Sequence, residues 1–286
     1  MIYSALISCS DLARNLNNQD WVIVDCRFDL SNPEFGRQAY YKSHLPGAVY
    51  AHLEEDLSGQ VTRGLSGRHP LPSAESLAVK LGNWGIDNSC QVVAYDAAGG
   101  SMAAARFWWL LKWLGHERVA VLDGGWPAWV KANLAVTSEV AAYRSRRFFP
   151  RLITGLTVDA TELISGESAK EWIIIDVRSP ERFRGEVEPI DPVAGHIPGA
   201  VNAPYTSNLD EDGFFLTPEE LRMKYQSLLG NKPVEKTVFY CGSGVTAAHS
   251  LLALFHAGFG MARLYPGSWS EWITDPHRPV STGQGN

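Results

Sequence analysis

Residues 238–249 read Val-Phe-Tyr-Cys-Gly-Ser-Gly-Val-Thr-Ala-Ala-His: a short apolar run that ends in a cysteine, then a glycine-rich loop and an apolar pattern with helical spacing. This order predicts a strand, a tight loop and the N-terminus of a helix. The first N–H groups of a helix have no intrahelical acceptor, and the helix dipole is positive there. Gly242 and Gly244 free the backbone to turn further N–H groups toward the sulfur of Cys241. The stretch predicts a cradle for an anion such as a thiolate.

The strand and loop at Cys241 have a counterpart in the first half of the chain, and three other landmarks recur in the same order. The pairs are an Asp-x-Arg at Asp25 and Asp176, a His-x-Pro-Gly-Ala-Val turn at His44 and His196, a strand end at Asp96 and Cys241, and a tryptophan at Trp126 and Trp269. The paired positions are 151, 152, 145 and 143 residues apart, so they drift only by loop length. Four landmarks in one order predict two copies of one domain.

Each copy alternates short apolar strands with helical patterns. This predicts an α/β fold, with a parallel sheet covered by helices on both faces in each domain. The predicted domains are residues 1–138 and 153–286, joined by a linker at 139–152. We expect the basic cluster of that linker to be solvated and to pair with acidic surface. Asp25 with Arg27 and Asp176 with Arg178 recur in both copies, so structural ion pairs are expected there.

The bulk composition excludes several classes of protein. A formal net charge of −6 argues against a nucleic-acid binder, which would be basic. The chain has no apolar run near the ~18 residues of a membrane span, and its N-terminus lacks a basic signal-peptide region. The four cysteines show no CxxC spacing, so we expect a reducing, cytoplasmic location without membrane or nucleic-acid partners. No spacing of His and Cys indicates a metal, and no cofactor is expected.

The tandem combination of Asp-x-Arg, Gly-His-Ile-Pro-Gly-Ala and Cys-x-x-Gly-Val-Thr-Ala resembles the two-domain rhodanese-like sulfurtransferases, over about residues 5–275. The resemblance implies two rhodanese-like domains, of which the first is catalytically silent because Asp96 stands in place of the cysteine. The loop Cys241-Gly242-Ser243 is similar to that of the 3-mercaptopyruvate sulfurtransferases. Thiosulfate-preferring members have two basic residues after the cysteine, which suits a dianionic donor.

The resemblance also implies roles for single residues. Cys241 is the nucleophile that becomes a persulfide, and a thiophilic acceptor (cyanide, a small thiol or a reducing protein thiol) then takes the outer sulfur. Ser243 and His69 assist proton transfer, with Glu54 as the acidic partner of His69. Arg182 binds the donor's carboxylate or sulfonate. The loop residues that surround the sulfur and bind substrate are Gly242, Gly244, Val245 and Thr246.

One position departs from the pattern of the mercaptopyruvate enzymes. They carry a second arginine after the one matched by Arg182, and this chain has Asp191 at that place. Arg184 is the nearest substitute in the sequence. The departure leaves two donors open, 3-mercaptopyruvate and thiosulfate.

Other classes of protein share parts of the pattern. A Cys-x5-Arg phosphatase needs an arginine where Ala247 stands, which argues against that class. Residues 242–247 match a Gly-x-Gly-x-x-Ala dinucleotide fingerprint, but they follow a late strand instead of the first one. A persulfide carrier without turnover is the non-enzymatic alternative, and it would use the same loop.

Overall fold

The computed structural model describes residues 2–164 and 172–284, which form two compact units. The first unit contains Met1–Gly59, Pro72–Ile153 and Glu211–Phe215. The second contains Gln60–Leu71, Thr154–Asp210 and Leu216–Asn286. The units thus differ from the two continuous ranges expected from the repeat, because each includes a short segment from the other half of the chain. Among the helices of the described ranges, none has the length and apolar character to cross a bilayer.

The expected linker at residues 139–152 lies along the first unit, and its arginines Arg144, Arg147 and Arg151 are exposed, as expected for a solvated basic cluster. The N–H of Arg146 donates to Gly82 O at 2.9 Å, and that of Arg151 donates to Leu114 O at 2.9 Å. Phe148 is buried. Burial of an aromatic ring and backbone pairing therefore fix this segment, and Arg146 of its basic cluster pairs with Asp87, as expected.

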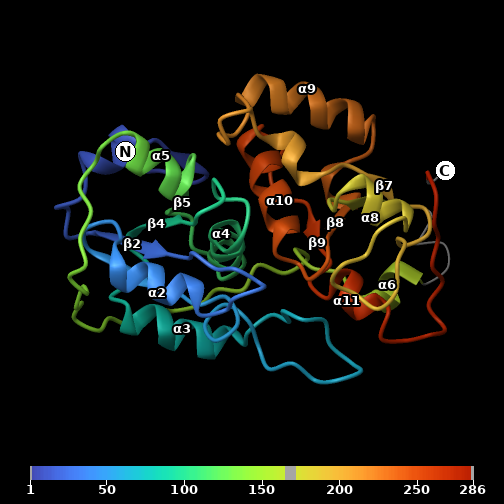
Figure 1. Ribbon diagram of the computed structural model, residues 1–286, viewed down its shortest axis with the longest axis horizontal. Helices are drawn as coiled ribbons and strands as arrows, with labels where there is room; N and C mark the ends of the chain where they lie inside the picture. Colours follow the sequence, from blue (N-terminus) through green and yellow to red (C-terminus); the bar gives the residue numbers. More distant parts are fainter. Residues whose placement is uncertain (1, 165–171, 285–286) are drawn as a thin grey trace. The chain divides into compact units, whose positions relative to one another are not determined.

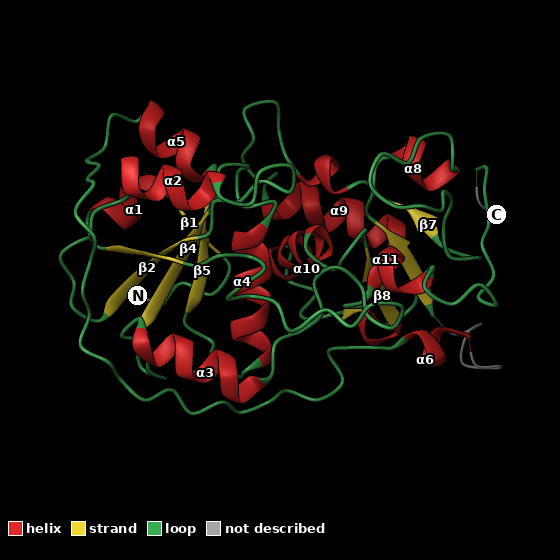
Figure 2. Ribbon diagram, turned by 60° about the horizontal axis from the view of Figure 1, so that its bottom comes forward, coloured by secondary structure: helices red, strands yellow, loops and turns green. Residues whose placement is uncertain are grey.

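The first unit contains a five-stranded parallel sheet in the order β1-β5-β4-β2-β3. Its elements are β1 (Leu6–Ile7), α1 (Cys9–Ala13), β2 (Trp21–Asp25), α2 (Phe35–Lys42), β3 (Ala48–Tyr50), α3 (Ala74–Asn83), β4 (Gln91–Tyr95), α4 (Ala103–Trp113), β5 (Val119–Leu122) and α5 (Gly125–Lys131). Helices α1, α2 and α5 lie on one face of the sheet, and α3 and α4 on the other (Figure 2). Both faces are covered, so the central strands β4 and β5 are buried along their length.

The second unit repeats this arrangement with a four-stranded parallel sheet in the order β7-β6-β8-β9. Its elements are α6 (Ala160–Ile164), β6 (Ile173–Asp176), α8 (Pro180–Arg184), β7 (Val201–Asn202), the 3-10 helices η1 (Tyr205–Asn208) and η2 (Val234–Lys236), α9 (Pro218–Leu229), β8 (Thr237–Tyr240), α10 (Thr246–His256), β9 (Arg263–Leu264) and α11 (Ser268–Trp272). Helices α6, α8 and α11 pack on one face, and α9 and α10 cover the other (Figure 1). The predicted α/β fold, with helices on both faces of two parallel sheets, is confirmed.

A buried ion pair braces the strand ends of the first unit. Asp25, the last residue of β2, receives hydrogen bonds from Nε and Nη2 of Arg27 at 3.0 and 2.6 Å. Tyr95, the last residue of β4, donates its hydroxyl to Asp25 at 2.6 Å. The guanidinium of Arg27 stacks on the ring of Trp126, 4.2 Å from its centroid. The charges of Asp25 and Arg27 are thus buried, but each is compensated by the other and by hydrogen bonds.

The second unit contains the same group of residues. Arg178 donates to Asp176 from Nη2 at 2.6 Å and to the carbonyl of Gly195 at 2.6 Å. Trp269 covers this guanidinium at 4.8 Å. Although burial opposes charge, the neighbouring carboxylate of Asp176 raises the pKa of Arg178. The ion pairs expected from the Asp-x-Arg repeat are confirmed in both units.

Candidate functional site

Strand β8 leads directly into Cys241, and α10 begins at Thr246. Cys241 is only 1% exposed. Its Sγ accepts the N–H of Gly244 at 3.1 Å, and its own N–H donates to Ser268 Oγ at 3.2 Å. Val245 precedes the helix and gives it no side-chain cap. The local order of strand, loop and helix start agrees with the sequence pattern.

The two loop glycines are needed for different reasons. Gly244 has a positive φ of 75°, and a Cβ there would lie 2.5 Å from the carbonyl oxygen of Pro266. Gly242 lacks a left-handed backbone, but a Cβ there would lie 2.8 Å from Nη2 of Arg68 and 3.7 Å from both Nη atoms of Arg182. We expected backbone freedom at both positions. At Gly242 the reason is instead the close approach of two guanidinium groups beside Cys241.

Ser243 and His69 are in direct contact within the second unit. Ser243 Oγ lies 2.8 Å from Nδ1 of His69, and both residues are buried. The segment Gln60–Leu71 brings His69 to this position, and it is held there in part by the N–H of Arg68, which donates to Ser270 Oγ at 3.1 Å. The N–H of Ser270 in turn donates to Gly242 O at 2.9 Å. A histidine thus reaches the hydroxyl that lies two residues after the thiol.

Four charged side chains meet next to Gly242. Arg182, on α8, donates to Glu188 from Nη2 at 2.7 Å and from Nε at 3.1 Å. The same Nη2 lies 3.2 Å from Oδ2 of Asp191, whose Oδ1 accepts from Nη1 of Arg68. The carboxylate of Asp191 therefore bridges the two arginines.

The pKa values of Asp191 and Glu188, the two acids of this cluster, are shifted in opposite directions. Burial raises the pKa of Asp191, although Arg68 and Arg182 oppose the shift. For Glu188 burial acts in the same direction, but hydrogen bonds from Arg182 and from the N–H of Asp191 outweigh it and lower the pKa. Glu188 is thus the firm counterion of Arg182, and Asp191 is the carboxylate whose charge is more costly to keep.

Two residues of this cluster were missed in the sequence. Arg68 directly precedes His69 in Gly67-Arg68-His69, and that proximity was the available signal. Glu188 gives no signal of its own. Arg184, the substitute considered for a second arginine, pairs with Glu186 at 2.7 Å and does not join the cluster. Glu54 belongs to the first unit, so its role as partner of His69 stays a prediction.

In the first unit a carboxylate fills the equivalent loop. Oδ1 of Asp96 accepts the N–H groups of Ala98 and Gly100 at 2.9 and 2.8 Å. Oδ2 accepts those of Met102 and Ala104 at 3.0 and 3.2 Å. Burial raises the pKa of Asp96, and these four bonds only partly oppose the shift. The loop after β4 therefore holds an anion that is part of the chain.

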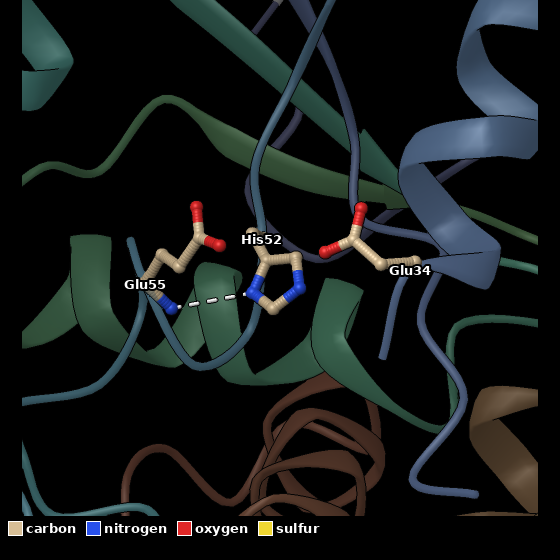
Figure 3. Close-up of side chains that lie close together, drawn as sticks. All are labelled: Glu34, His52 and Glu55. Carbon is tan, nitrogen blue, oxygen red and sulfur yellow. Dashed lines mark hydrogen bonds between the residues drawn. The ribbon is translucent and has the colours of Figure 1, made fainter. Parts of the chain in front are cut away.

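Glu34, His52 and Glu55 form a group with metal-ligand chemistry in the first unit (Figure 3). Both ring nitrogens of His52 are engaged: Nδ1 accepts the N–H of Glu55 at 3.3 Å, and Nε2 lies 3.1 Å from Pro33 O. Arg37 contacts both carboxylates, Glu55 at 2.6 Å and Glu34 at 3.3 Å. The arginine supplies the positive charge that a metal would bring, so we assign no metal here.

Comparison with known proteins agrees with this architecture. A model of the rhodanese-like domain matches residues 8–132 and again residues 159–275. A relative from Pseudomonas aeruginosa, provisionally named a 3-mercaptopyruvate sulfurtransferase, is 50% identical over 99% of this chain and 100% of its own length. A relative from Mycobacterium tuberculosis, provisionally named a thiosulfate sulfurtransferase, is 41% identical over 97% of both chains.

Among solved structures, the 3-mercaptopyruvate sulfurtransferase of Leishmania major is similar to this chain with a TM-score of 0.83 and 31% identity. The match covers 96% of this chain and 75% of that one. Domain matches in both halves, near-complete coverage by relatives and the shared fold lead to one conclusion. The chain belongs to the rhodanese-like domain family, as a sulfurtransferase with two such domains.

Proposed function

We propose that this sulfurtransferase takes a sulfane sulfur from 3-mercaptopyruvate onto Cys241 and passes it to a thiophilic acceptor such as cyanide, a small thiol or a protein thiol. The observation that carries the proposal is the surroundings of Cys241. Its sulfur accepts a loop N–H, a Ser–His pair follows it, and two arginines lie over Gly242. The same loop has no cationic side chain of its own at positions 242 and 243.

In the first step the Cys241 thiolate attacks the sulfur of 3-mercaptopyruvate. An S–S bond forms and the C–S bond breaks, so the electron pair leaves on carbon as the enolate of pyruvate. The enolate then takes one proton, for which Ser243 is the donor and His69 the group that reprotonates it. The products are pyruvate and the Cys241 persulfide. The N–H groups of the loop stabilise the persulfide anion.

In the second step an acceptor attacks the outer sulfur and releases the Cys241 thiolate. The donor product leaves before the acceptor reacts, so the kinetics are expected to be ping-pong. Substrate positioning is assigned to Arg182 and to the loop residues Gly242, Gly244, Val245 and Thr246. We further propose a reducing, cytoplasmic setting, supported by the free thiols of all four cysteines.

The leaving group supports 3-mercaptopyruvate over thiosulfate. Sulfite departs from thiosulfate as a stable anion that needs no proton, whereas pyruvate enolate needs one. A buried serine in contact with a histidine two residues after the thiol is useful only in the second case. Thiosulfate also carries two negative charges, which would favour basic residues at positions 242 and 243, and this chain has Gly and Ser there.

The decisive measurement compares kcat/KM for 3-mercaptopyruvate and thiosulfate with cyanide as the acceptor. We expect 3-mercaptopyruvate to be preferred by at least about tenfold, equivalent to about 1.4 kcal/mol. A preference for thiosulfate would overturn the proposed donor. Under excess donor and acceptor the enzyme should turn over many times, and a single burst of one sulfur per Cys241 would instead indicate a carrier protein.

A further inference from the structure

Arg68 is a second cation beside the reactive loop, and the residues of the loop itself did not predict it. Its Nη2 is the atom that a Cβ at position 242 would meet, at 2.8 Å. Among the described residues its side chain has one partner, Asp191, and its buried Nε has no acceptor. The guanidinium of Arg68 thus places Nη2 next to Gly242, and its Nε is a donor without an acceptor among the described residues.

Arg182 approaches the same glycine from α8, with both Nη atoms 3.7 Å from the position of that missing Cβ. The two guanidinium groups therefore converge on one point directly after Cys241. Like charges at this distance repel unless an anion lies between them. In the structure Asp191 has that role, since its two oxygens pair with one arginine each.

The carboxylate of Asp191 is the same chemical group as the carboxylate of a small 2-oxo acid, and it pairs with two arginines. A carboxylate accepts fork-like hydrogen bonds from guanidinium groups, and Asp191 occupies that position between Arg68 and Arg182. Arg182 keeps Glu188 as a second counterion, whereas Asp191 is the one acidic partner of Arg68 among the described residues. Exchange of one carboxylate for another leaves both arginines paired.

A pocket in the second unit gives a ligand access to Arg68, one of these two arginines. Arg68 and Asp191 line a pocket of about 330 Å³ together with apolar residues that include Val61 and Ile190. Arg68 therefore both lines the pocket and approaches Gly242, and 28% of its side chain is exposed. An arginine with a solvent-exposed side can change partners without opening the core.

We propose that Arg68 and Arg182 together bind the carboxylate of the sulfur donor, and that Asp191 is an internal anion which occupies this clamp until the donor displaces it. The inference rests on the proposed use of an anionic donor. It makes Arg68 a substrate-binding residue and explains how an aspartate can stand where a second arginine was expected. The aspartate does not bind the donor; it holds the arginine that does.

The test measures KM and kcat for the sulfur donor in the full-length Arg68→Met variant. The KM for 3-mercaptopyruvate is expected to rise about 10–100-fold, with kcat changed less than about threefold, because a lost ground-state contact acts on binding. The matched control is Arg184→Met, which removes an arginine paired with Glu186 outside the cluster and should leave KM unchanged. With the methyl ester of 3-mercaptopyruvate, the Arg68→Met effect should disappear. An unchanged KM for the charged donor would overturn the proposal.

Asp191 supplies two further variants. Asp191→Asn should lower the KM for 3-mercaptopyruvate several-fold, because the competing anion is gone. The double variant Arg68→Met/Asp191→Asn separates donor binding from mere loss of charge balance. If Arg68 binds the donor, the double variant keeps the high KM; if Arg68 only neutralises Asp191, the double variant recovers the wild-type KM, and the proposal is wrong.

Failure of this inference can be told from failure of the proposed function. If the wild type prefers thiosulfate, the proposed donor is wrong, and the same variants are then measured with thiosulfate, which is also an anion. Pyruvate as a competitive inhibitor gives a readout that needs no particular donor. Its inhibition constant should rise about tenfold or more in Arg68→Met and stay unchanged in Arg184→Met.

Discussion

The loop after β4 and the loop after β8 both direct backbone N–H groups at a side chain, a carboxylate in the first loop and a thiol in the second. Both follow a central strand, and both lead into a helix that packs on the sheet. In the first loop the Asp96 carboxylate accepts four backbone N–H groups and is permanently bound. In the second the Cys241 sulfur accepts the N–H of Gly244, and its side chain has no second acceptor atom to engage further N–H groups.

The difference shows what makes one loop reactive. The carboxylate of Asp96 uses up the donors that would otherwise stabilise an incoming charge. A thiolate has one atom in place of two oxygens, so it leaves room for a second sulfur. The position that matches Ser243 is Ala98 in the first loop, and the first unit thus lacks the hydroxyl as well as the thiol. The scaffold is shared, and the chemistry depends on a few side chains.

The largest expected effect comes from removing the thiol. Cys241→Ser should lower sulfur transfer to cyanide more than about 10³-fold, because a serine oxygen does not form a persulfide. Adding Asp96→Cys to this variant places a thiol in the first loop. Activity is expected to remain lost, since that unit has no counterpart of Ser243. Recovery of even a tenth of the wild-type rate would mean that the loop alone is sufficient.

The next effect concerns the Ser–His pair that only the second loop has. Ser243→Ala should lower kcat for 3-mercaptopyruvate about 10²-fold, as expected for loss of a proton donor. His69→Gln should act similarly, and the two changes together should cost little more than one, because the groups act as a unit. Thiosulfate turnover by the same variants is the control, since sulfite leaves without a proton. Equal losses with both donors would contradict the proton-transfer role.

Asp96→Asn tests the internal anion of the first loop through stability. An amide nitrogen would face two of the four N–H donors, so we expect a loss of about 2 kcal/mol in the free energy of unfolding at pH 7. Relief of the buried charge offsets part of the larger loss that two unmet donors would cause. Urea denaturation measures the effect, with Asp212→Asn, at an exposed ion pair of the same unit, as the control. Equal stabilities of the two variants would refute the cradle role of Asp96.

The smallest effect concerns pH. Burial lowers the pKa of His116 from 6.5 to about 4, so between these values the unfolded chain binds a proton that the folded unit does not. Stability therefore falls as the pH drops below 6.5 and is unaffected above it. Phe259 stands at the matching position of the second unit. The His116→Phe variant should lose about 1–2 kcal/mol less than the wild type between pH 7 and pH 5.

The His116→Phe comparison is insensitive to other titrating groups. The raised pKa of Asp96 acts in the opposite direction, because a folded state that prefers the protonated acid gains stability on acidification. Asp96 is present in both proteins, so its contribution cancels in the difference. Identical pH profiles of unfolding for the two proteins would show that His116 does not control acid sensitivity.

The repeat, the parallel sheets and the strand–loop–helix order at Cys241 were accessible from sequence because they depend on local patterns of apolar residues and glycines. The contact of Ser243 with His69 came only through resemblance, since 174 positions separate the two residues. The bridge from Arg68 to Asp191 spans 123 positions and was missed. No local pattern encodes which distant segment reaches a loop, and the reason for Gly242 depends on that segment too.

The short segments exchanged between the halves of the chain affect how the protein is made. The second unit contains Gln60–Leu71, which leaves the ribosome long before Thr154–Asp210 and Leu216–Asn286. The first unit likewise takes up Glu211–Phe215, which is synthesised after both of its larger pieces. Neither half can complete its native structure during translation until most of the chain has emerged. A gene fragment that encodes only residues 153–286 would lack Arg68 and His69, so its product could not form the complete site around Cys241.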